Sequence, residues 1–371
     1  MSRKRVLLVF GTRPEAIKMA PVVRRLRERS ADFETVVAVT AQHREMLDQV
    51  LEVFSIEPDF DLDIMLPRQT LTQVTTRALD RLTPVIEEVT PDAILVQGDT
   101  TTTFVAALAA FYHKVPVGHV EAGLRTGDIY QPYPEEMNRR LTSQLARWHF
   151  APTATSSARL LGEGVDPSRV HVTGNTVIDA LLEAVEMEYE FPPGPVADAL
   201  AGGERIVLMT MHRRENWGQP ARDVCQAVLR LAREFDDVRV LFSVHKNPAV
   251  RETVQGLLGG TPRVDLIEPL DYLPFVKLMQ AATLILSDSG GMQEEAPSLG
   301  KPVLVLRNKT ERPEAIEAGT ARLVGTDTDT VFAEAARLLS DPVAYDEMAQ
   351  ASNPFGDGRA AQRIADILAG S

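Results

Sequence analysis

Short runs of aliphatic and β-branched residues alternate with amphipathic stretches along nearly the whole chain. The expected strands are residues 5–10, 34–39, 93–96, 115–120 and 149–151 in the first half, and 206–209, 239–243, 264–267, 283–286 and 303–306 in the second. Strands that are apolar on both faces and separated by helices are typical of parallel sheets covered by helices. The pattern therefore predicts two α/β units, each built around a parallel sheet.

A stretch rich in proline and glycine separates the two halves. Residues 186–204 include Pro192, Pro193, Gly202 and Gly203. Because proline removes a backbone donor and glycine is conformationally free, this composition disfavours helix and strand and predicts a linker. We therefore expect a first domain over 1–185, a linker over 186–204 and a second domain over 205–357. A chain of 371 residues is long enough for each domain to bury its own core.

The charge balance and the cysteine content limit the partners of the chain. The formal net charge is −13, and an acidic surface repels phosphates, so we expect no nucleic-acid partner. The single cysteine, Cys225, excludes an intrachain disulfide. The apolar run 6–10 is too short for a signal peptide or a membrane span. We therefore expect a soluble cytoplasmic protein with no membrane association.

The common cofactor and metal motifs are missing. A GxGxxG dinucleotide motif does not occur, since Pro167 stands where Gly162 and Gly164 would need a third glycine. Lys301 is followed by proline, so it does not belong to a P-loop. The seven histidines include no pair at the helical spacing of metal ligands. We expect no nicotinamide, flavin or metal cofactor.

A glycine turn follows one expected strand of the second half. The segment SDSGGMQEE, residues 287–295, places two glycines between the strand 283–286 and a helix start. Backbone amides of such a turn can close on an anion, and the positive end of the helix favours a diphosphate there. The two glutamates that follow could accept hydrogen bonds from ribose hydroxyls. These features indicate a nucleotide site, although a helix capped by Ser289 explains the same residues.

Charged residues of the first half follow expected strands or begin helices. Arg13 and Lys18 come after the first strand, Asp99 and Glu121 after two later strands, and Glu135 begins a helix. Since α/β proteins place their sites at the carboxyl ends of parallel strands, these residues are candidates for binding or catalysis. Helix caps, solvated helix ends and simple ion pairs with a nearby arginine are the alternative interpretations.

A basic triplet follows the first strand of the second half. His212, Arg213 and Arg214 come after the strand 206–209, in a chain that is acidic overall. Their position at a strand end indicates that they face an anion near the glycine turn, and a solvated surface run is the alternative.

In combination, these motifs resemble the non-hydrolysing UDP-N-acetylglucosamine 2-epimerase family over nearly the whole chain. The matching segments are GTRPEAIKMAP at 11–21, QHREMLDQV at 42–50, QGDTTT at 97–102, HVEAGLRTGD at 119–128, YPEEMNRR at 133–140, TGNTVID at 173–179, HRREN at 212–216 and SDSGGMQEEAPSLGKPVLVLRNKTERPEA at 287–315. The resemblance implies an α/β fold of GT-B architecture, with two Rossmann-like domains whose parallel sheets face a cleft. It also implies that UDP is held mainly by the second domain, and that a final helix over 358–371 packs back on the first.

The reaction that the resemblance implies is the reversible C2 epimerisation of UDP-N-acetylglucosamine to UDP-N-acetylmannosamine, without a cofactor. The C2 proton is not next to a carbonyl group, so a side-chain base cannot remove it directly. Elimination of UDP to a glycal solves this, because the oxocarbenium character at C1 acidifies C2. Protonation on the other face and re-addition of UDP give the epimer. The route needs preorganised cations for the diphosphate and at least two acid/base groups.

The resemblance also assigns roles to particular residues. The implied active-site positions are Arg13, Lys18, Asp99, Glu121, Glu135 and His212. The implied UDP contacts, in addition to these, are Arg213, Leu270, Phe275, Ser289, Gly290, Gly291, Glu295 and Arg312. The turn 270–275 corresponds to the uracil-binding segment of the family, where relatives carry a glutamine in place of leucine. Which of the three carboxylates removes the proton stays open.

Two further properties are implied by the resemblance. A second UDP-N-acetylglucosamine next to the active site, which would favour a closed cleft, would be held by Gln42, His43, Arg68, Gln69, Glu136, Arg213 and His245. The alternative interpretation is that these seven are ordinary solvated residues at the rim of the implied cleft. A homodimer is also implied, and the helices 71–89 and 104–112 are apolar enough to contribute to its interface, although core packing explains them equally well.

Three other functions share parts of this pattern. A retaining GT-B glycosyltransferase would share the UDP site, and a hydrolysing epimerase would share the elimination step but release UDP. A sensor of UDP-sugars would keep the glycine turn and could dispense with Asp99, Glu121 and Glu135. Because the chain retains all three carboxylates, we favour the reversible epimerase, whose product feeds polysaccharide biosynthesis.

Overall fold

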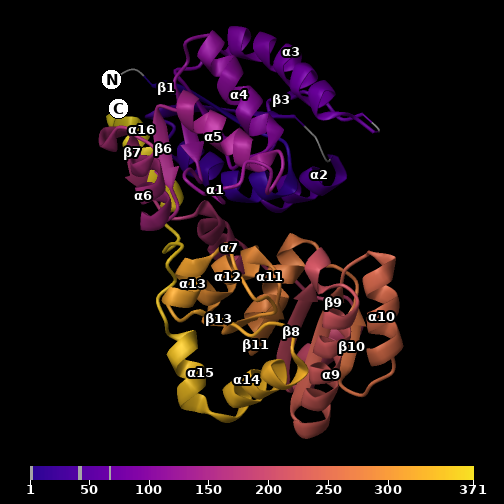
Figure 1. Cartoon of the computed structure of the whole chain (residues 1–371). Helices are drawn as coiled ribbons and strands as arrows, with labels where there is room; N and C mark the ends of the chain where they lie inside the picture. Colours follow the sequence, from indigo (N-terminus) through magenta and orange to yellow (C-terminus); the bar gives the residue numbers. More distant parts are fainter. Residues whose placement is uncertain (1–2, 41–43, 67) are drawn as a thin grey trace. The chain divides into compact units, whose positions relative to one another are not determined.

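The chain folds into two α/β units. The structure is a computed structural model that describes residues 3–40, 44–66 and 68–371. Unit 1 comprises Met1–Leu182 and Phe355–Ser371, and unit 2 comprises Glu183–Pro354 (Figure 1). Each unit contains its own parallel sheet, which confirms the expected fold class of two Rossmann-like domains. None of the helices in the described part of the chain is long and apolar enough to cross a membrane.

The sheet of unit 1 has seven parallel strands. They are β1 (Lys4–Phe10), β2 (Phe33–Val39), β3 (Phe60–Asp61), β4 (Ala93–Gln97), β5 (Val117–Val120), β6 (Trp148–Ala151) and β7 (Val170–Val172). Their order in space is β3-β2-β1-β4-β5-β6-β7. The central strands are buried along most of their length, which explains why they are continuous apolar runs in the sequence.

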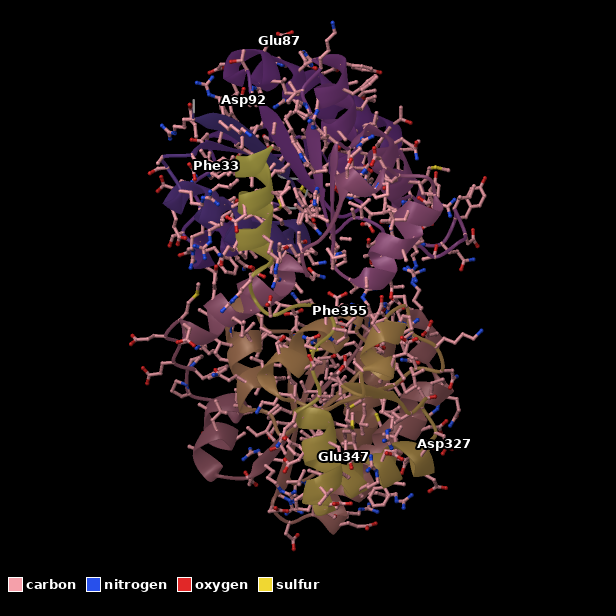
Figure 2. All side chains as sticks on the ribbon, turned by 90° about the vertical axis from the view of Figure 1, so that its left-hand side faces the viewer. Phe33, Glu87, Asp92, Asp327, Glu347 and Phe355 are labelled. Atoms are coloured by element: carbon pink, nitrogen blue, oxygen red, sulfur yellow. The ribbon has the colours of Figure 1, made fainter. Side chains whose placement is uncertain are left out.

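Helices cover the sheet of unit 1. They are α1 (Arg13–Glu28), α2 (Arg44–Val53), α3 (Leu71–Val89), α4 (Thr101–Tyr112), α5 (Glu135–Leu145), α6 (Ala154–Gly162), α7 (Thr176–Glu186) and α16 (Ala360–Gly370), with a short 3₁₀ turn at Pro167–Arg169. The helices α3 and α4 pack with β1 and β4 in one apolar core. The last helix, α16, packs against α1. There Arg29 donates to Asp366 at 2.6 Å and lies over the ring of Phe33, which is labelled in Figure 2.

The sheet of unit 2 has six parallel strands, in the order β10-β9-β8-β11-β12-β13. The strands are β8 (Arg205–Met211), β9 (Val238–Val244), β10 (Val264–Ile267), β11 (Leu284–Ser287), β12 (Val303–Val305) and β13 (Ala321–Leu323). The helices are α8 (Pro195–Gly202), α9 (Gln219–Glu234), α10 (Pro248–Leu258), α11 (Tyr272–Ala281), α12 (Gly290–Glu295), α13 (Pro313–Glu317), α14 (Thr328–Ser340) and α15 (Pro342–Ala349), with 3₁₀ turns at Arg214–Asn216 and Ala296–Leu299. The apolar face of α9 packs with α14 and with β8, β9 and β11 in one core.

The ten strands expected from the sequence are all present. Three further strands, β3, β7 and β13, are two or three residues long. Their sequences, FD, VHV and ARL, are not continuous apolar runs, and their pairing with β2, β6 and β12 makes them strands.

The expectation that residues 186–204 lack helix is wrong, because α8 lies within this range. Pro195 occupies the first turn of α8, where proline needs no backbone donor, and Gly203 ends the helix in the left-handed conformation. Val196 and Ala199 are buried and hold the helix in place. The proline and glycine that suggested a linker are thus the start and stop signals of a short helix.

The order of strands reverses beside β1 in unit 1 and beside β8 in unit 2. From β1 the chain proceeds to β2 on one side and later returns to β4 on the other, and β8 is flanked in the same way by β9 and β11. In open α/β sheets, ligands bind at the carboxyl ends of the strands at such a reversal. The segments after β1, β4, β8 and β11 are therefore the places to look for a site.

One buried carboxylate anchors the last helix of unit 1. Asp179 of α7 accepts hydrogen bonds from the backbone N–H groups of Ala360 at 3.2 Å and Ala361 at 2.9 Å, at the start of α16. Burial raises the pKa of Asp179 to about 6, although these hydrogen bonds act in the opposite direction. Between pH 4 and 6 the folded state therefore keeps a proton that the unfolded state has released, and Asp179 lowers stability as the pH rises through this window.

We predict that Asp179→Asn removes this pH dependence. The variant keeps an acceptor for α16 but has no carboxylate to ionise, so its free energy of unfolding relative to the parent chain should rise from pH 4 to 6, by up to about 3 kcal/mol. Urea titrations at several pH values measure this difference. Asp166→Asn is the matched control in the same unit: hydrogen bonds from Ser168 lower the pKa of Asp166, so its effect on stability lies below pH 4 and the difference from the parent chain should stay flat between pH 4 and 6. A flat difference for Asp179→Asn would contradict the prediction.

Candidate active site

Glu121 lies at the centre of a buried polar cluster after β5. Its carboxylate accepts hydrogen bonds from Lys18 Nζ at 2.5 Å, Gln97 Nε2 at 2.5 Å and Asn175 Nδ2 at 3.1 Å. The residue has φ of +64°, a conformation that is unfavourable for glutamate and is often found at functional sites. The nearby Arg125 pairs with another carboxylate, that of Glu163. Lys18 therefore supplies the cation that pairs with Glu121.

Glu15 joins the segments that follow β1 and β4. Its fully buried carboxylate accepts from the backbone N–H groups of Gly11 at 3.1 Å and Thr12 at 2.8 Å, and from the hydroxyls of Thr100 at 2.7 Å and Thr103 at 3.2 Å. Burial raises the pKa of this carboxyl group, and the hydrogen bonds from Thr100, Thr12 and Gly11 oppose the change. The starts of α1 and α4 are thereby fixed to one another.

Arg13 begins α1 beside this junction. Its side chain is half-buried, and it forms no hydrogen bond or ion pair with another described residue. A cation in this state is available to an anionic ligand.

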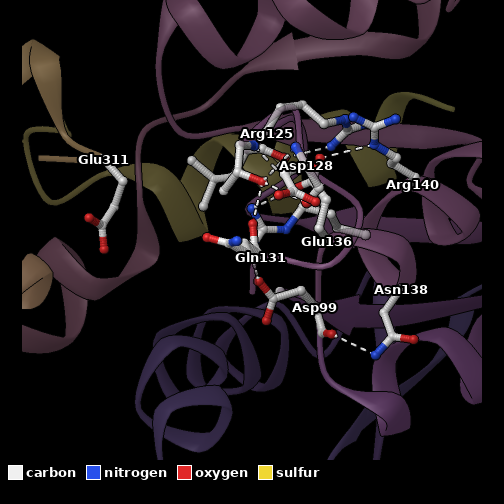
Figure 3. Close-up of polar contacts among 12 residues, drawn as sticks. Asp99, Arg125, Asp128, Gln131, Glu136, Asn138, Arg140 and Glu311 are labelled. Atoms are coloured by element: carbon white, nitrogen blue, oxygen red, sulfur yellow. Dashed lines mark hydrogen bonds and ion pairs between the residues drawn. The ribbon is translucent and has the colours of Figure 1, made fainter. Parts of the chain in front are cut away.

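Asp99 follows β4 and is held by α5. Its carboxylate forms an ion pair with Arg139, and its backbone carbonyl accepts from Asn138 Nδ2 at 3.0 Å (Figure 3). The backbone carbonyl of the preceding residue, Gly98, accepts a hydrogen bond from His119 Nε2 at 2.7 Å. Burial is the main reason why the pKa of His119 falls to about 4. His119 is therefore neutral at pH 7 and acts as a donor to the turn that carries Asp99.

Glu135 and Glu136 are adjacent in sequence but lie in different surroundings. Glu135 is half-buried at the first position of α5, and its side chain makes no hydrogen bond or ion pair with the rest of the described chain. Glu136 is fully buried and accepts from Arg140 Nε at 2.9 Å, Arg139 Nη1 at 3.3 Å and the N–H of Thr126 at 3.1 Å (Figure 3). Among the described residues, Glu135 thus has a free side chain, whereas Glu136 connects the start of α5 to the segment at Thr126.

In unit 2, Asp288 connects the segments after β8 and β11. Its carboxylate is completely buried and receives His212 Nδ1 at 2.9 Å, Asn216 Nδ2 at 2.9 Å and the backbone N–H groups of His212 and Arg213 at 3.0 and 2.9 Å. Burial would raise the pKa of Asp288, but the bonds from His212, Arg213 and Asn216 outweigh it and lower the pKa. The His212 side chain itself is 42% exposed.

Arg213 lies beside the glycine turn and is paired with Glu311. The Nη2 to Oε1 distance is 2.7 Å, and Arg307 donates to the other Glu311 oxygen at 2.5 Å. Although burial opposes it, the hydrogen bond from Arg307 and the charges of both arginines lower the pKa of Glu311 to about 2. A Cβ added to Gly290 would lie 3.8 Å from Glu311 and 4.0 Å from Arg213, so this glycine faces the pair directly.

The remaining residues expected to contact UDP lie along α11, α12 and α13. Ser289 is the N-cap of α12, and Gly290 and Gly291 form its first turn. Arg312 precedes α13 and forms an ion pair with the buried Glu294. Glu295 is half-buried at the end of α12, Leu270 is half-buried just before α11, and Phe275 is half-buried within α11. The structure therefore brings the glycine turn, Arg213 and His212 to the same edge of the unit 2 sheet.

The residues expected to hold a second ligand are only partly described. Gln42 and His43 lie outside the described residues. Arg68 is exposed, and Gln69 donates to the carbonyl of Ile64 at 3.0 Å. His245 is exposed, with its ring centroid 6.5 Å from that of His212.

The sequence reasoning missed three buried polar residues. Gln97 and Asn175 donate to Glu121, and Asp288 contacts His212. The signal for Asp288 was available, because β8 and β11 are expected neighbours and a carboxylate at the end of a buried strand needs a partner. Gln97 and Asn175 gave no comparable signal, because neutral amides are common at strand and helix ends. No three His, Cys, Asp or Glu residues within the described ranges are grouped so that they could hold a metal ion.

The chain has two domains with parallel sheets, and each carries charged residues where the order of its strands reverses. These features define an α/β protein of the GT-B class. Comparison with known proteins narrows this class. A family model described as UDP-N-acetylglucosamine 2-epimerase matches residues 24–369. A UDP-N-acetylglucosamine 2-epimerase from Yersinia pestis is 56% identical over 369 residues, which is 98% of each chain.

Solved structures agree with this match. A putative UDP-N-acetylglucosamine 2-epimerase from Listeria monocytogenes has a TM-score of 0.94 and 49% identity, covering 99% of this chain and 96% of that one. A UDP-GlcNAc 2-epimerase from Neisseria meningitidis bound to UDP-GlcNAc has a TM-score of 0.86 and 49% identity, covering 99% of this chain and 100% of that one. The chain therefore belongs to the UDP-N-acetylglucosamine 2-epimerase family and is an enzyme of that family, which confirms the resemblance noted from its motifs.

Proposed function

We propose that this protein interconverts UDP-N-acetylglucosamine and UDP-N-acetylmannosamine without hydrolysing them. One observation carries the proposal: in a member of this family, Asp99, Glu121 and Lys18 are all retained at the edge of unit 1 where the strand order reverses. A relative from Neisseria meningitidis binds UDP-GlcNAc, which supports the substrate. Unit 2 binds the UDP group, and unit 1 supplies the groups that act on the sugar.

The first step breaks the bond between C1 and the diphosphate oxygen. The bonding electron pair leaves with UDP, and C1 acquires oxocarbenium character, which acidifies the C2 proton. Removal of that proton gives the glycal. The negative charge that develops on the diphosphate is greatest at this stage, so donors held in place beforehand lower the barrier. Arg13, Lys18, His212 and the amides of the turn at Gly290 and Gly291 are the donors in this proposal.

Proton removal and proton delivery occur on opposite faces of C2. Asp99 and Glu121 each have a cationic partner, Arg139 and Lys18, whereas Glu135 has no partner among the described residues. The three carboxylates therefore differ in whether a cation is paired with them, and an acid and a base at C2 require groups in different surroundings. Re-addition of UDP to C1 after protonation on the second face completes the inversion.

A homodimer is part of the proposal. Leu71 of α3 and Phe111 and Tyr112 of α4 are exposed, and the last two leave about 60% of their surface accessible. The helices α3 and α4 pack side by side in unit 1, so these large apolar side chains belong to one helical layer. Large exposed apolar groups of this kind are typical of a subunit interface.

Incubation with UDP-N-acetylglucosamine in D₂O tests the reaction. We expect deuterium at C2 in both nucleotide sugars, with the nucleotide still attached, as measured by NMR and mass spectrometry. Asp99→Asn, Glu121→Gln and Glu135→Gln should each bind UDP but lose epimerisation. A variant that still exchanges deuterium into recovered substrate would exclude its residue as the base. Glu163→Gln, which alters a carboxylate paired with Arg125, is the control and should stay active.

Two other outcomes of that incubation would contradict the proposal. Accumulation of free N-acetylmannosamine with UDP would show a hydrolysing enzyme. Binding of UDP-N-acetylglucosamine without any deuterium incorporation would show a binding protein or a glycosyltransferase that lacks its acceptor.

Neutral replacement of the proposed leaving-group donors tests the role of the cations. For His212→Asn and Arg13→Ala we predict that kcat and kcat/KM fall together, by roughly 100-fold or more, because the lost interaction is strongest in the transition state. Steady-state kinetics in both directions measure this. Arg214→Ala is the matched control within the basic triplet, since Arg214 lies over the ring of Trp217. Near-normal turnover of His212→Asn would remove that residue from the mechanism.

We also propose that UDP-N-acetylglucosamine activates the enzyme from a second site that includes Arg68 and His245. Both side chains are exposed and available to a ligand. Pure UDP-N-acetylmannosamine should then react only after a lag that a trace of UDP-N-acetylglucosamine abolishes, and forward kinetics should be sigmoidal. Arg68→Ala or His245→Ala should make them hyperbolic, while Lys246→Ala should not. Immediate turnover of pure UDP-N-acetylmannosamine by the parent chain would contradict this regulation.

A further inference from the structure

We propose that Asp288 is a positioning residue for His212, which keeps a proton on Nδ1 and directs Nε2 to the leaving diphosphate. The inference rests on the proposed function, because His212 acts there as a donor to the departing UDP. It goes beyond that function by assigning a second residue, which does not touch the substrate, to the same step.

The contacts of Asp288 show that it acts as an ionised acceptor. Its side chain is completely buried and receives two side-chain donors, from His212 and Asn216, and two backbone donors, from His212 and Arg213. A carboxylate that is buried among several N–H groups is stabilised in its charged form, since each donor offsets part of the lost hydration. A protonated carboxyl group would place an O–H among these donors and lose at least one bond.

An ionised Asp288 determines which nitrogen of His212 carries the proton. A neutral imidazole has one N–H and one lone pair, and a carboxylate can only accept. The 2.9 Å contact between Asp288 Oδ1 and His212 Nδ1 therefore places a proton on Nδ1. The backbone N–H of His212 donates to the same carboxylate, which restricts the orientation of the ring. Within the described part of the chain, no hydrogen bond engages Nε2, and this nitrogen is left for the ligand.

With Nδ1–H held by Asp288, the ring can donate from Nε2 only when both nitrogens carry protons, and the negative charge of Asp288 then lies beside the cation. When the C1–O bond breaks and its electron pair moves to the diphosphate, Nε2–H donates a hydrogen bond to that oxygen. On re-addition the electron pair returns to C1, and the proton stays on His212. A carboxylate behind a histidine has the same function in other enzymes, where it holds the ring in one tautomer and stabilises its cation.

A purely structural role of Asp288 is the competing explanation. The same carboxylate fastens the segment after β8 to the end of β11 through backbone N–H groups, so its loss could act through local disorder alone. A decrease in activity after substitution would not separate the two roles. The experiment must therefore read the proton on His212 directly and compare variants with and without that histidine.

Nitrogen-15 NMR of histidine-labelled parent protein gives the direct reading. The signals of His212 are those that disappear in His212→Asn. At a pH where the ring is neutral, we expect the proton on Nδ1 and the lone pair on Nε2, the reverse of the usual preference of a free histidine side chain. A majority of the Nε2–H tautomer in the parent chain would overturn the proposal, and this measurement does not depend on whether any Asp288 variant folds.

A double-mutant cycle tests whether Asp288 acts through His212. We expect Asp288→Asn to lower kcat by roughly 10- to 100-fold, with a smaller effect on KM, as for residues that orient a catalytic group. In the His212→Asn background the same substitution should lower kcat by less than about threefold, because coupled residues are not additive. Additive losses would overturn the proposal. Asp327→Asn, which removes the charge of the α14 cap residue but keeps an acceptor there, is the control and should leave activity unchanged.

The outcomes distinguish this inference from the proposed function. If the parent chain does not epimerise its substrate but carries the proton on Nδ1 of His212, the proposed function fails and the positioning of His212 stands. If the parent chain epimerises and the cycle is additive, the proposed function stands and the role of Asp288 is structural.

Discussion

The parallel pairing of β1 with β4 and of β8 with β11 is the constraint on which the rest of the site depends. Each pair lies where the strand order reverses, so the two segments that follow the paired strands begin side by side at one sheet edge. Both units join these segments through a buried carboxylate. Glu15 does so in unit 1, where it binds amides after β1 and hydroxyls after β4, and Asp288 does so in unit 2. In both units, a buried carboxylate therefore links the two segments that begin where the strand order reverses.

Ion pairs within each unit hold most of the charged site residues in place. Lys18 is paired with Glu121, Arg213 with Glu311 and Arg312 with Glu294. A buried or half-buried charge without a partner is costly, so pairing allows an acidic chain to keep these groups inside its domains. In the proposed function, a diphosphate at these cations would compete with the carboxylates that pair with them.

The sequence predicted the framework well because the framework depends on local patterns. Apolar runs identified ten of the strands, and the glycines and charged residues after them identified the turns that carry the candidate site. The elements that the sequence did not predict were also missed for local reasons. The helix from Pro195 to Gly202 was overlooked because its start and stop residues also occur in linkers, and β3, β7 and β13 are strands only through their neighbours.

The sequence by itself determined the fold class, the positions of the main strands along the chain, and the identity of the charged residues that follow them, because these depend on residue type and spacing along the chain. The tertiary structure decided which charged groups have partners. Glu135 and Glu136 are adjacent in sequence, yet one has a free side chain and the other is buried among arginines. Gln97, Asn175 and Asp288 became visible as orienting residues only through their contacts. Hydrogen bonds and burial depend on distances between residues far apart in the chain, and the folded arrangement sets those distances.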